Sequence, residues 1–314
     1  MELSLFFFLL QQKSSKQTKN MILIADSGST KTDWAIVTST AQPVVINTQG
    51  INPVHQSREE IVKILSDEFQ SRMSDNTDVR RLKSSGVLTP EFPLAVYFYG
   101  SGVRPEKEAQ IEQLLREVFP QAITVEAHSD LLGAARALCG RKEGIACILG
   151  TGANSCLYDG KEIVSHTPAL GYIIGDEGSG AVLGKRLIHD LYGGILEKEL
   201  VEMFEQETGL TLPKIIDRVY RQPLANRWLA SLSEFIGRHL EFTGLQNLVE
   251  ECFTDFLTYH VEPYEHKNLP VSFVGSVAWH YQDLLRDAAE DMDYKVGNIL
   301  QSPLGGLVGY HLAK

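Results

Sequence analysis

Two glycine-containing turns carry residue types that suit the binding of phosphate groups. The first is Asp26-Ser27-Gly28-Ser29-Thr30-Lys31-Thr32 and the second is Gly150-Thr151-Gly152-Ala153-Asn154, and each follows an apolar run. Glycine leaves outward-pointing backbone N–H groups uncovered by a Cβ, and several such groups in one turn form a concavity for an anion. In the first turn Ser29, Thr30 and Thr32 add hydroxyl donors, and Lys31 adds a positive charge.

Neither turn matches the P-loop, because the GxxxxGK[ST] spacing is absent and a strand, not a helix, follows each turn. One such turn alone is also compatible with a tight hairpin that binds no ligand. The presence of two equivalent turns favours a single polyphosphate gripped from both sides. The phosphate-binding residues predicted on this basis are Gly28, Ser29, Thr30, Lys31, Thr32, Gly150, Thr151 and Gly152.

Asp26 ends the first apolar run, at the end of a strand where open α/β sheets bind their ligands. A carboxylate beside a phosphate turn is repulsive unless a cation lies between them. Asp26 therefore indicates a Mg²⁺ site, reached through water because Mg²⁺ keeps much of its hydration. The alternative is that Asp26 hydrogen-bonds the backbone of its own turn. A third glycine, Gly275, follows the apolar run 271–274 and either admits the nucleoside end of a ligand or forms a plain strand-to-helix turn.

The elements around the two turns occur twice in the same order. In the first half we expect strands at 21–26, 33–37 and 44–47, a helix at 57–73, a loop at 74–93, then strand 94–99, helix 105–119, strand 122–127 and helix 130–138. In the second half we expect strands at 144–149, 155–158 and 161–165, helices over 178–262, then strand 271–274, helix 279–291, a short strand at 294–296 and a final helix from 305. The repeat predicts two related α/β domains facing each other across a cleft.

The expected domains are 21–130 and 131–302, with a helical insertion at 178–262 and a final helix, 303–314, that packs back on the first domain. Residues 1–20 fit neither domain. Their apolar run, LSLFFFLL, is too short to span a bilayer and lacks the flanks of a signal peptide. We interpret this segment as a non-native, over-long or disordered start, with the working chain beginning at Met21. The alternative is a secreted or membrane-tethered form of the protein.

The composition of the 314-residue chain restricts its partners. The net charge of −11 argues against nucleic acid as the main ligand, because phosphate backbones are held by clustered Lys and Arg. The four cysteines show no metal-ligand or disulfide spacing, which is typical of a reducing compartment and predicts a cytoplasmic protein. No membrane association is expected, and the block 178–262 is large enough to carry a homodimer face.

Taken together, the motifs D26-S-G-S-T-K-T, G150-T-G-A-N, G175-D-E-G-S-G and F273-V-G-S-V resemble those of the BadF/BadG/BcrA/BcrD-type ATPases. This branch belongs to the sugar kinase, Hsp70 and actin superfamily, and the chain is most similar to its N-acetylglucosamine kinase-like members. The resemblance covers Met21 to Lys314. It implies two actin-like (ribonuclease H-like) α/β domains around a cleft, and an enzyme that uses ATP and Mg²⁺ to phosphorylate a hydroxyl of an amino sugar.

The resemblance also implies roles for individual residues. Asp130 corresponds to the general base, although an aspartate at this place could instead cap the helix that it begins, unless Ser129 does so. Asp176, Gly171 and Asn52 correspond to sugar-contacting residues, with Thr151 and Gly152 between the sugar and the γ-phosphate. Asp176 could also be a helix cap, and Asn52, before Pro53, a turn residue.

The sequence departs from the amino-sugar kinases at two places. Asn52-Pro53-Val54 stands where these often have Asn-His-Trp, and Ala169-Leu170-Gly171-Tyr172 replaces a Gly-Trp-Gly-type segment, which leaves the exact sugar open. Two other functions also remain. One is an ATPase that activates a partner enzyme, for which the related proteins bind an iron–sulfur cluster through cysteines. The other is a nucleotide-dependent sugar sensor.

Overall fold

The structure is a computed structural model that describes residues 21–28, 30–90 and 92–313. The predictions made for residues 1–20 and for Ser29 therefore lie outside the described residues. The chain divides into two compact units. The first contains the described residues up to Ala137 together with those from Pro303 onward, and the second contains Leu138–Ser302.

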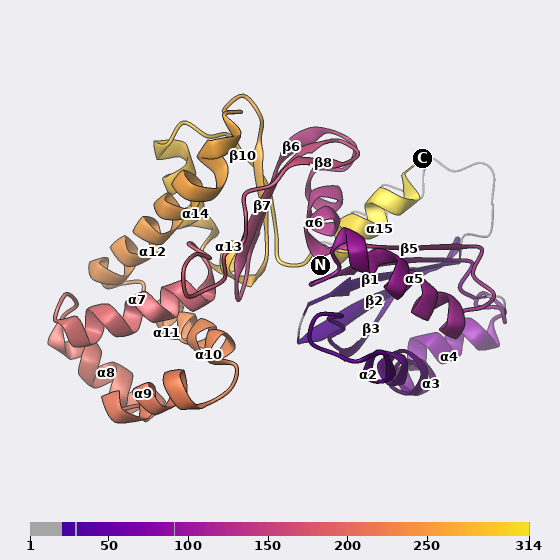
Figure 1. Ribbon diagram of the computed structural model, residues 1–314, viewed down its shortest axis with the longest axis horizontal. Helices are drawn as coiled ribbons and strands as arrows, with labels where there is room; N and C mark the ends of the chain where they lie inside the picture. Colours follow the sequence, from indigo (N-terminus) through magenta and orange to yellow (C-terminus); the bar gives the residue numbers. More distant parts are fainter. Residues whose placement is uncertain (1–20, 29, 91, 314) are drawn as a thin grey trace. The chain divides into compact units, whose positions relative to one another are not determined.

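A five-stranded sheet forms the centre of the first unit (Figure 1). Its strands are β1 (Ile22–Ser27), β2 (Lys31–Val37), β3 (Val44–Gln49), β4 (Ala95–Gly100) and β5 (Thr124–Ser129), in the order β3-β2-β1-β4-β5. Strands β1, β2 and β3 form an antiparallel meander, and β4 and β5 run parallel to β1. Strand β1 is apolar almost throughout because both of its faces are covered: Leu23 lies in one core cluster and Ile24 in another.

Helices cover both faces of this sheet. They are α2 (Arg58–Lys63), the π-helix η2 (Ile64–Glu68), α3 (Phe69–Asp75), α4 (Thr77–Ser84), α5 (Pro105–Val118), α6 (Asp130–Cys139) and α15 (Leu304–Leu312). One core cluster contains buried side chains of α2 to α5, such as Phe69 and Leu115. The other contains Leu307 and Val308 of α15, which packs against β1 and β2.

The predicted loop at 74–93 is wrong over its first part, because α4 lies there. Asn76 caps this helix by accepting hydrogen bonds from the N–H groups of Asp78 and Val79. Only Val79 and Leu82 of α4 are buried. Two apolar positions three residues apart are enough to hold one helical face against a core, but they are too few to stand out from a polar sequence.

The second unit repeats the strand order of the first. Its strands are β6 (Glu143–Leu149), β7 (Ala153–Asp159), β8 (Ile163–Ser165), β9 (Val271–Val274) and β10 (Val296–Leu300), in the order β10-β9-β6-β7-β8. Strands β6, β7 and β8 form an antiparallel meander, while β9 and β10 add in parallel. The predicted α/β fold with two equivalent halves is thereby confirmed.

Most helices of the second unit lie between β8 and β9 in the chain. They are α7 (Gly180–Gly193), α8 (Lys198–Thr208), α9 (Leu212–Arg221), α10 (Ala225–Ser231), α11 (Ser233–Arg238), α12 (Thr243–Phe256), the π-helix η3 (Leu257–Val261) and the short 3₁₀ helix η4 (Glu262–Tyr264). The helix expected at 279–291 is two helices, α13 (Ser276–His280) and α14 (Gln282–Asp291), separated at Tyr281. Within the described parts of the chain, no helix is both long and apolar enough to cross a membrane.

Candidate active site

Carboxylates gather at one edge of the first sheet. Strands β1, β4 and β5 run parallel and in register, so that Ser27 pairs with Gly100 and Gly100 with Ser129. This register brings Asp26, near the end of β1, to the same edge as Asp130, which follows β5. Burial, the charge of Asp33 and the charge of Asp130 together raise the pKa of Asp26 to about 7. Lys31, which lies 2.9 Å from Asp33, opposes this shift.

This edge has the character of a site for a hard cation that keeps its water. The side chains concerned offer carboxylate oxygens, which Mg²⁺ prefers, and a cation would relieve the repulsion that raises the pKa of Asp26. Across the described residues, however, no group of three or more His, Cys, Asp or Glu side chains could hold a metal ion by itself. The carboxylate of Asp26 by itself fits the predicted contact with a Mg²⁺ ion through water.

The first glycine turn is held together by a buried pair of hydroxyls. The hydroxyl oxygens of Ser27 and Thr32 are 2.7 Å apart, and Thr32 also donates to the carbonyl of Gln49. Both side chains are fully buried. The expectation that Thr32 donates to ATP needs correction, because its hydroxyl is engaged within the protein. Gly28, Thr30 and Lys31 are exposed at the turn.

Asp130 begins α6 without being its cap. The N–H of Leu132 donates to the Ser129 hydroxyl at 3.2 Å, so Ser129 caps the helix. The N–H of Leu131 donates to one carboxylate oxygen of Asp130 at 2.9 Å. Burial raises the pKa of Asp130 despite this hydrogen bond. A carboxylate whose proton affinity is raised in this way is a better proton acceptor than an exposed one.

Asn52 is buried and shapes the loop after β3. Its side-chain oxygen accepts a hydrogen bond from the N–H of Val54 at 2.9 Å, and its own N–H donates to Gln56. The same oxygen lies so near Gly102 that a Cβ there would be 2.3 Å away. These contacts are those of an Asx turn, the alternative that the following proline suggested.

In the second unit, the other glycine turn lies against α7 and Gly275. The N–H groups of Gly180 and Ala181, at the start of α7, donate to the carbonyls of Gly150 and Thr151. Gly275 has a φ of 129°, and a Cβ on it would lie 2.2 Å from the Leu149 carbonyl oxygen. By contrast, a Cβ on Gly150 would meet nothing within 4 Å. Packing within this unit therefore requires glycine at 275 but not at 150.

Asp176 extends the same site. Its carboxylate is 3.0 Å from where a Cβ on Gly152 would lie, and hydrogen bonds to it involve the backbone of Ala153 and Gly171. The pKa of Asp176 is raised, chiefly by burial. Asp176 is not the cap of α7, because the Ser179 hydroxyl accepts from the N–H of Val182. The structure thus brings Gly152, Gly171 and Asp176 together.

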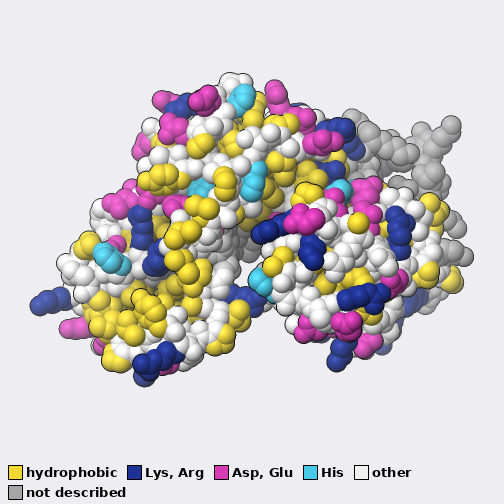
Figure 2. Space-filling view, in the orientation of Figure 1, with side chains coloured by type: hydrophobic (Ala, Val, Ile, Leu, Met, Phe, Trp, Pro, Cys, Tyr) yellow, Lys and Arg dark blue, Asp and Glu magenta, His cyan; other side chains and the backbone are white. Residues whose placement is uncertain are grey.

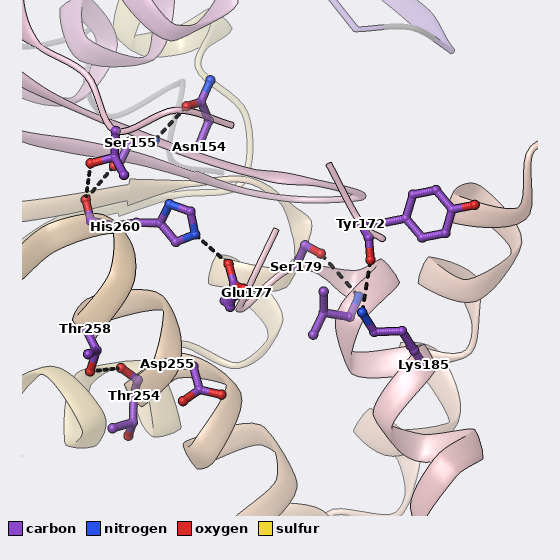
Figure 3. A network of polar contacts seen from close by, with 12 residues as sticks. Asn154, Ser155, Tyr172, Glu177, Ser179, Lys185, Thr254, Asp255, Thr258 and His260 are labelled. Atoms are coloured by element: carbon purple, nitrogen blue, oxygen red, sulfur yellow. Dashed lines mark hydrogen bonds and ion pairs between the residues drawn. The ribbon is translucent and has the colours of Figure 1, made fainter. Parts of the chain in front are cut away.

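A polar network beside Asp176 was not predicted from the sequence (Figure 3). His260 is 2.7 Å from Glu177, and the His260 carbonyl accepts from the hydroxyls of Ser155 and Thr167. The only sequence signal was the adjacency of Glu177 to Asp176, since a histidine 83 residues further on shows no pattern.

Comparison with known proteins identifies the relatives of the chain. Neither a model of a known protein family nor a curated protein sequence matches it. Among solved structures, a putative N-acetylglucosamine kinase of Porphyromonas gingivalis is 46% identical, with a TM-score of 0.84 over 93% of this chain and 99% of that one. A putative N-acetylglucosamine kinase of Chromobacterium violaceum is 19% identical, with a TM-score of 0.65 over 93% and 99%.

The ethanolamine utilization protein EutJ of Carboxydothermus hydrogenoformans shares the fold at 14% identity, with a TM-score of 0.54 over 99% and 98% of the two chains. The last two similarities establish the fold alone. The identity to the Porphyromonas gingivalis protein extends over nearly the whole of both chains and establishes kinship. The chain therefore belongs to the same family as that protein, within the superfamily of actin-like ATP-dependent sugar kinases.

Proposed function

We propose that the protein transfers the γ-phosphoryl group of Mg-ATP to a hydroxyl of an amino sugar like N-acetylglucosamine. The observation that carries this proposal is that each unit places a carboxylate beside its glycine turn. In the first unit Asp26 precedes the turn, and in the second Asp176 lies against Gly152. Kinship with the Porphyromonas gingivalis protein supports the choice of sugar.

We assign the nucleotide to the glycine turns. In the first unit Gly28, Thr30 and Lys31 are exposed and can contact phosphate oxygens. In the second unit the open space at Gly150 leaves room for a ligand, with Thr151, Gly152 and Gly275 beside it. Mg²⁺ would neutralise charge on the transferred phosphoryl group, and Asp26 would hold it through water.

We assign the binding and activation of the acceptor sugar to the carboxylates of Asp130 and Asp176. Asp130 accepts the proton of the attacking hydroxyl, a role that its raised pKa supports. Asp176 accepts hydrogen bonds from other sugar hydroxyls, since a carboxylate can accept several. Gly171 lies beside Asp176, and Asn52 completes the proposed set as the residue that shapes the loop after β3.

We also propose that the chain belongs to the BadF/BadG branch of the superfamily, and this proposal rests on the sequence motifs alone.

The partner-activating ATPases of that branch are the second candidate function. The cysteines favour the kinase, because a cluster held between two subunits needs thiols at the surface, whereas Cys147, Cys156 and Cys252 are buried and Cys139 is only partly exposed. The four free cysteines support a cytoplasmic location for the same enzyme.

A panel of amino sugars tests the proposal, with ADP release from Mg-ATP as the readout. We expect ADP release to depend on sugar and to be fastest with N-acetylglucosamine or a close relative. A rate of ADP release that does not change when sugar is added would instead indicate the partner-activating ATPase. Binding of ATP and sugar without ADP release would indicate a sensor.

We further propose a homodimer formed through α9. Figure 2 shows hydrophobic side chains gathered over α8 and α9. On α9, Leu212, Ile216 and Tyr220 recur every four residues and are 42%, 49% and 78% exposed. An exposed apolar stripe on one helix is typical of a face that meets another protein surface.

A further inference from the structure

The backbone at Asp176 is strained and must be held in place. Asp176 has a φ of 59°, in the left-handed region that residues with a side chain rarely adopt. Such a conformation persists only where surrounding contacts impose it. The turn also lies between two glycines with positive φ, Gly171 and Gly178. The turn therefore depends on contacts from elsewhere in the unit.

His260 supplies such a contact through Glu177, the residue after Asp176. Nε2 of the ring lies 2.7 Å from a carboxylate oxygen of Glu177 (Figure 3). His260 is 4% exposed, and its ring stacks on Phe256, with centroids 5.1 Å apart and planes at 24°. The Glu177 side chain is 26% exposed, but the buried ring makes this charge-assisted hydrogen bond stronger than one at the surface, and the stacking holds the ring in one orientation.

The backbone of His260 is fixed by the elements on the other side of the site. Its carbonyl accepts hydrogen bonds from Ser155 at 2.7 Å and from Thr167 at 3.2 Å. The Tyr264 hydroxyl contacts the same two residues. Ser155 lies on β7 directly after the glycine turn, and Thr167 precedes Gly171. His260 thus connects both of these segments to the Asp176 turn.

The imidazole ring of His260 makes its side-chain hydrogen bond through one nitrogen, Nε2. Nδ1 is buried and, among the described residues, has no hydrogen-bond partner. The hydrogen bond to Glu177 is therefore made by Nε2, and the imidazole also acts electrostatically on Asp176, whose pKa it lowers against the larger effect of burial. His260 also lies in the π-helix η3, and π-helical turns occur often at functional sites.

We propose that His260 is a positioning residue that sets the Asp176 carboxylate for sugar binding by holding Glu177. This inference rests on the proposed function, in which Asp176 contacts the sugar. Loss of the hydrogen bond should release the turn and weaken sugar binding, while the ATP-binding turn keeps its own contacts with α7.

Three variants test the proposal in the full-length protein. His260→Phe keeps the stacking and removes the hydrogen bond, and we expect the KM for sugar to rise about tenfold with the KM for ATP unchanged. His260→Gln places an amide donor where Nε2 was and should restore the KM for sugar. The control is His239→Phe, because Nε2 of His239 lies 2.7 Å from Glu207 and its ring lies 4.5 Å from Phe235.

A purely structural role would shift both KM values, or neither, and Gln would not rescue the sugar KM selectively. Either result overturns the proposal. Hydrogen exchange of segment 166–180 separates this inference from the proposed function. Should the wild type phosphorylate no sugar, faster exchange of that segment in His260→Phe than in His239→Phe would still support the positioning role, and equal exchange would refute it.

Discussion

At the scale of single residues, Asp26 shows how neighbouring charges tune a side chain. Its carboxylate lies among two others, Asp33 and Asp130, with Lys31 as the cation that opposes them. Burial, and after it this crowding of carboxylates, raises its pKa to about 7. A carboxylate in such surroundings is costly to ionise until a cation approaches, and this cost is one reason why we propose a metal-bound ligand here.

Replacing Asp26 by Asn should reveal this cost as a pH-dependent gain in stability. Because the pKa is raised in the folded state, the wild type is stabilised by Asp26 only at low pH and loses that contribution as the pH rises from about 4 through about 7. Asp26→Asn should therefore be more stable than the wild type at pH 8, by about 2 kcal/mol after allowing for partial exposure, and similar at pH 4.

Urea unfolding without nucleotide or Mg²⁺ at the two pH values measures this difference. If Asp26→Asn changed the free energy of unfolding by the same amount at pH 4 and at pH 8, the pKa of Asp26 would not be raised. In the same variant the Mg²⁺ concentration needed for half-maximal rate should increase. An unchanged Mg²⁺ titration would leave Asp26 with a role in the turn only.

Asp130→Asn tests the proposed base. The amide oxygen of Asn can accept the hydrogen bond from Leu131, and Ser129 still caps α6, so the fold should persist. We expect kcat to fall about 10³-fold while sugar binding remains. Turnover assays and calorimetry measure the two quantities. A variant that binds sugar normally and turns over at nearly the wild-type rate would exclude Asp130 as the base.

At the scale of elements, glycine has two different uses in the second unit. Gly275 is required by the fold, because any side chain there would collide with the Leu149 carbonyl on β6. Gly150 faces open space, so the protein itself could accept a side chain at that position. A ligand that approaches the backbone of the turn, however, would collide with a side chain at this position.

Gly150→Ala should therefore affect nucleotide binding and not stability. We expect the KM for ATP to rise at least about tenfold, with the free energy of unfolding within about 0.5 kcal/mol of the wild type. Gly193→Ala is the matched control, since a Cβ at Gly193 also meets nothing within 4 Å but lies at the end of α7. Equal KM values for ATP in the two variants would contradict the assignment of Gly150.

At the scale of the whole molecule, the stripe on α9 is the surface through which we propose that two copies of the chain associate. Ile216 lies on the exposed face of α9, while Ile215 beside it is buried in the core. A helix with two apolar faces buries one of them in the core of its own unit, and the other stays exposed to solvent unless another surface packs on it. A second copy of the chain would cover this face.

Ile216→Glu should convert a dimer to a monomer without loss of the fold. The side chain is 49% exposed, so the charge costs little in the monomer and much in an apolar interface. Light scattering after gel filtration measures the mass. Ile123→Glu, at a position 79% exposed in the first unit, is the control and should stay dimeric. A wild type that is monomeric at tens of micromolar would refute the dimer.

Much of the architecture could be predicted because its causes are local. The apolar runs that became β1 and β6 stand out, since strands buried on both faces need unbroken hydrophobic sequence. Helix α4 was missed because its two buried residues are separated by polar ones. The break at Tyr281 was missed because the apolar pattern continues through it, with Leu285 buried like Val277.

The sequence by itself determined the repeated order of elements along the chain, the two glycine turns and the presence of Asp26, Asp130 and Asp176 beside strand or helix ends. These features follow from neighbours in the chain. Only the tertiary structure decided that the Thr32 hydroxyl is hydrogen-bonded within the protein and that His260 lies within hydrogen-bond distance of Glu177. Burial and hydrogen bonding between distant segments depend on how elements pack, and no local pattern encodes them.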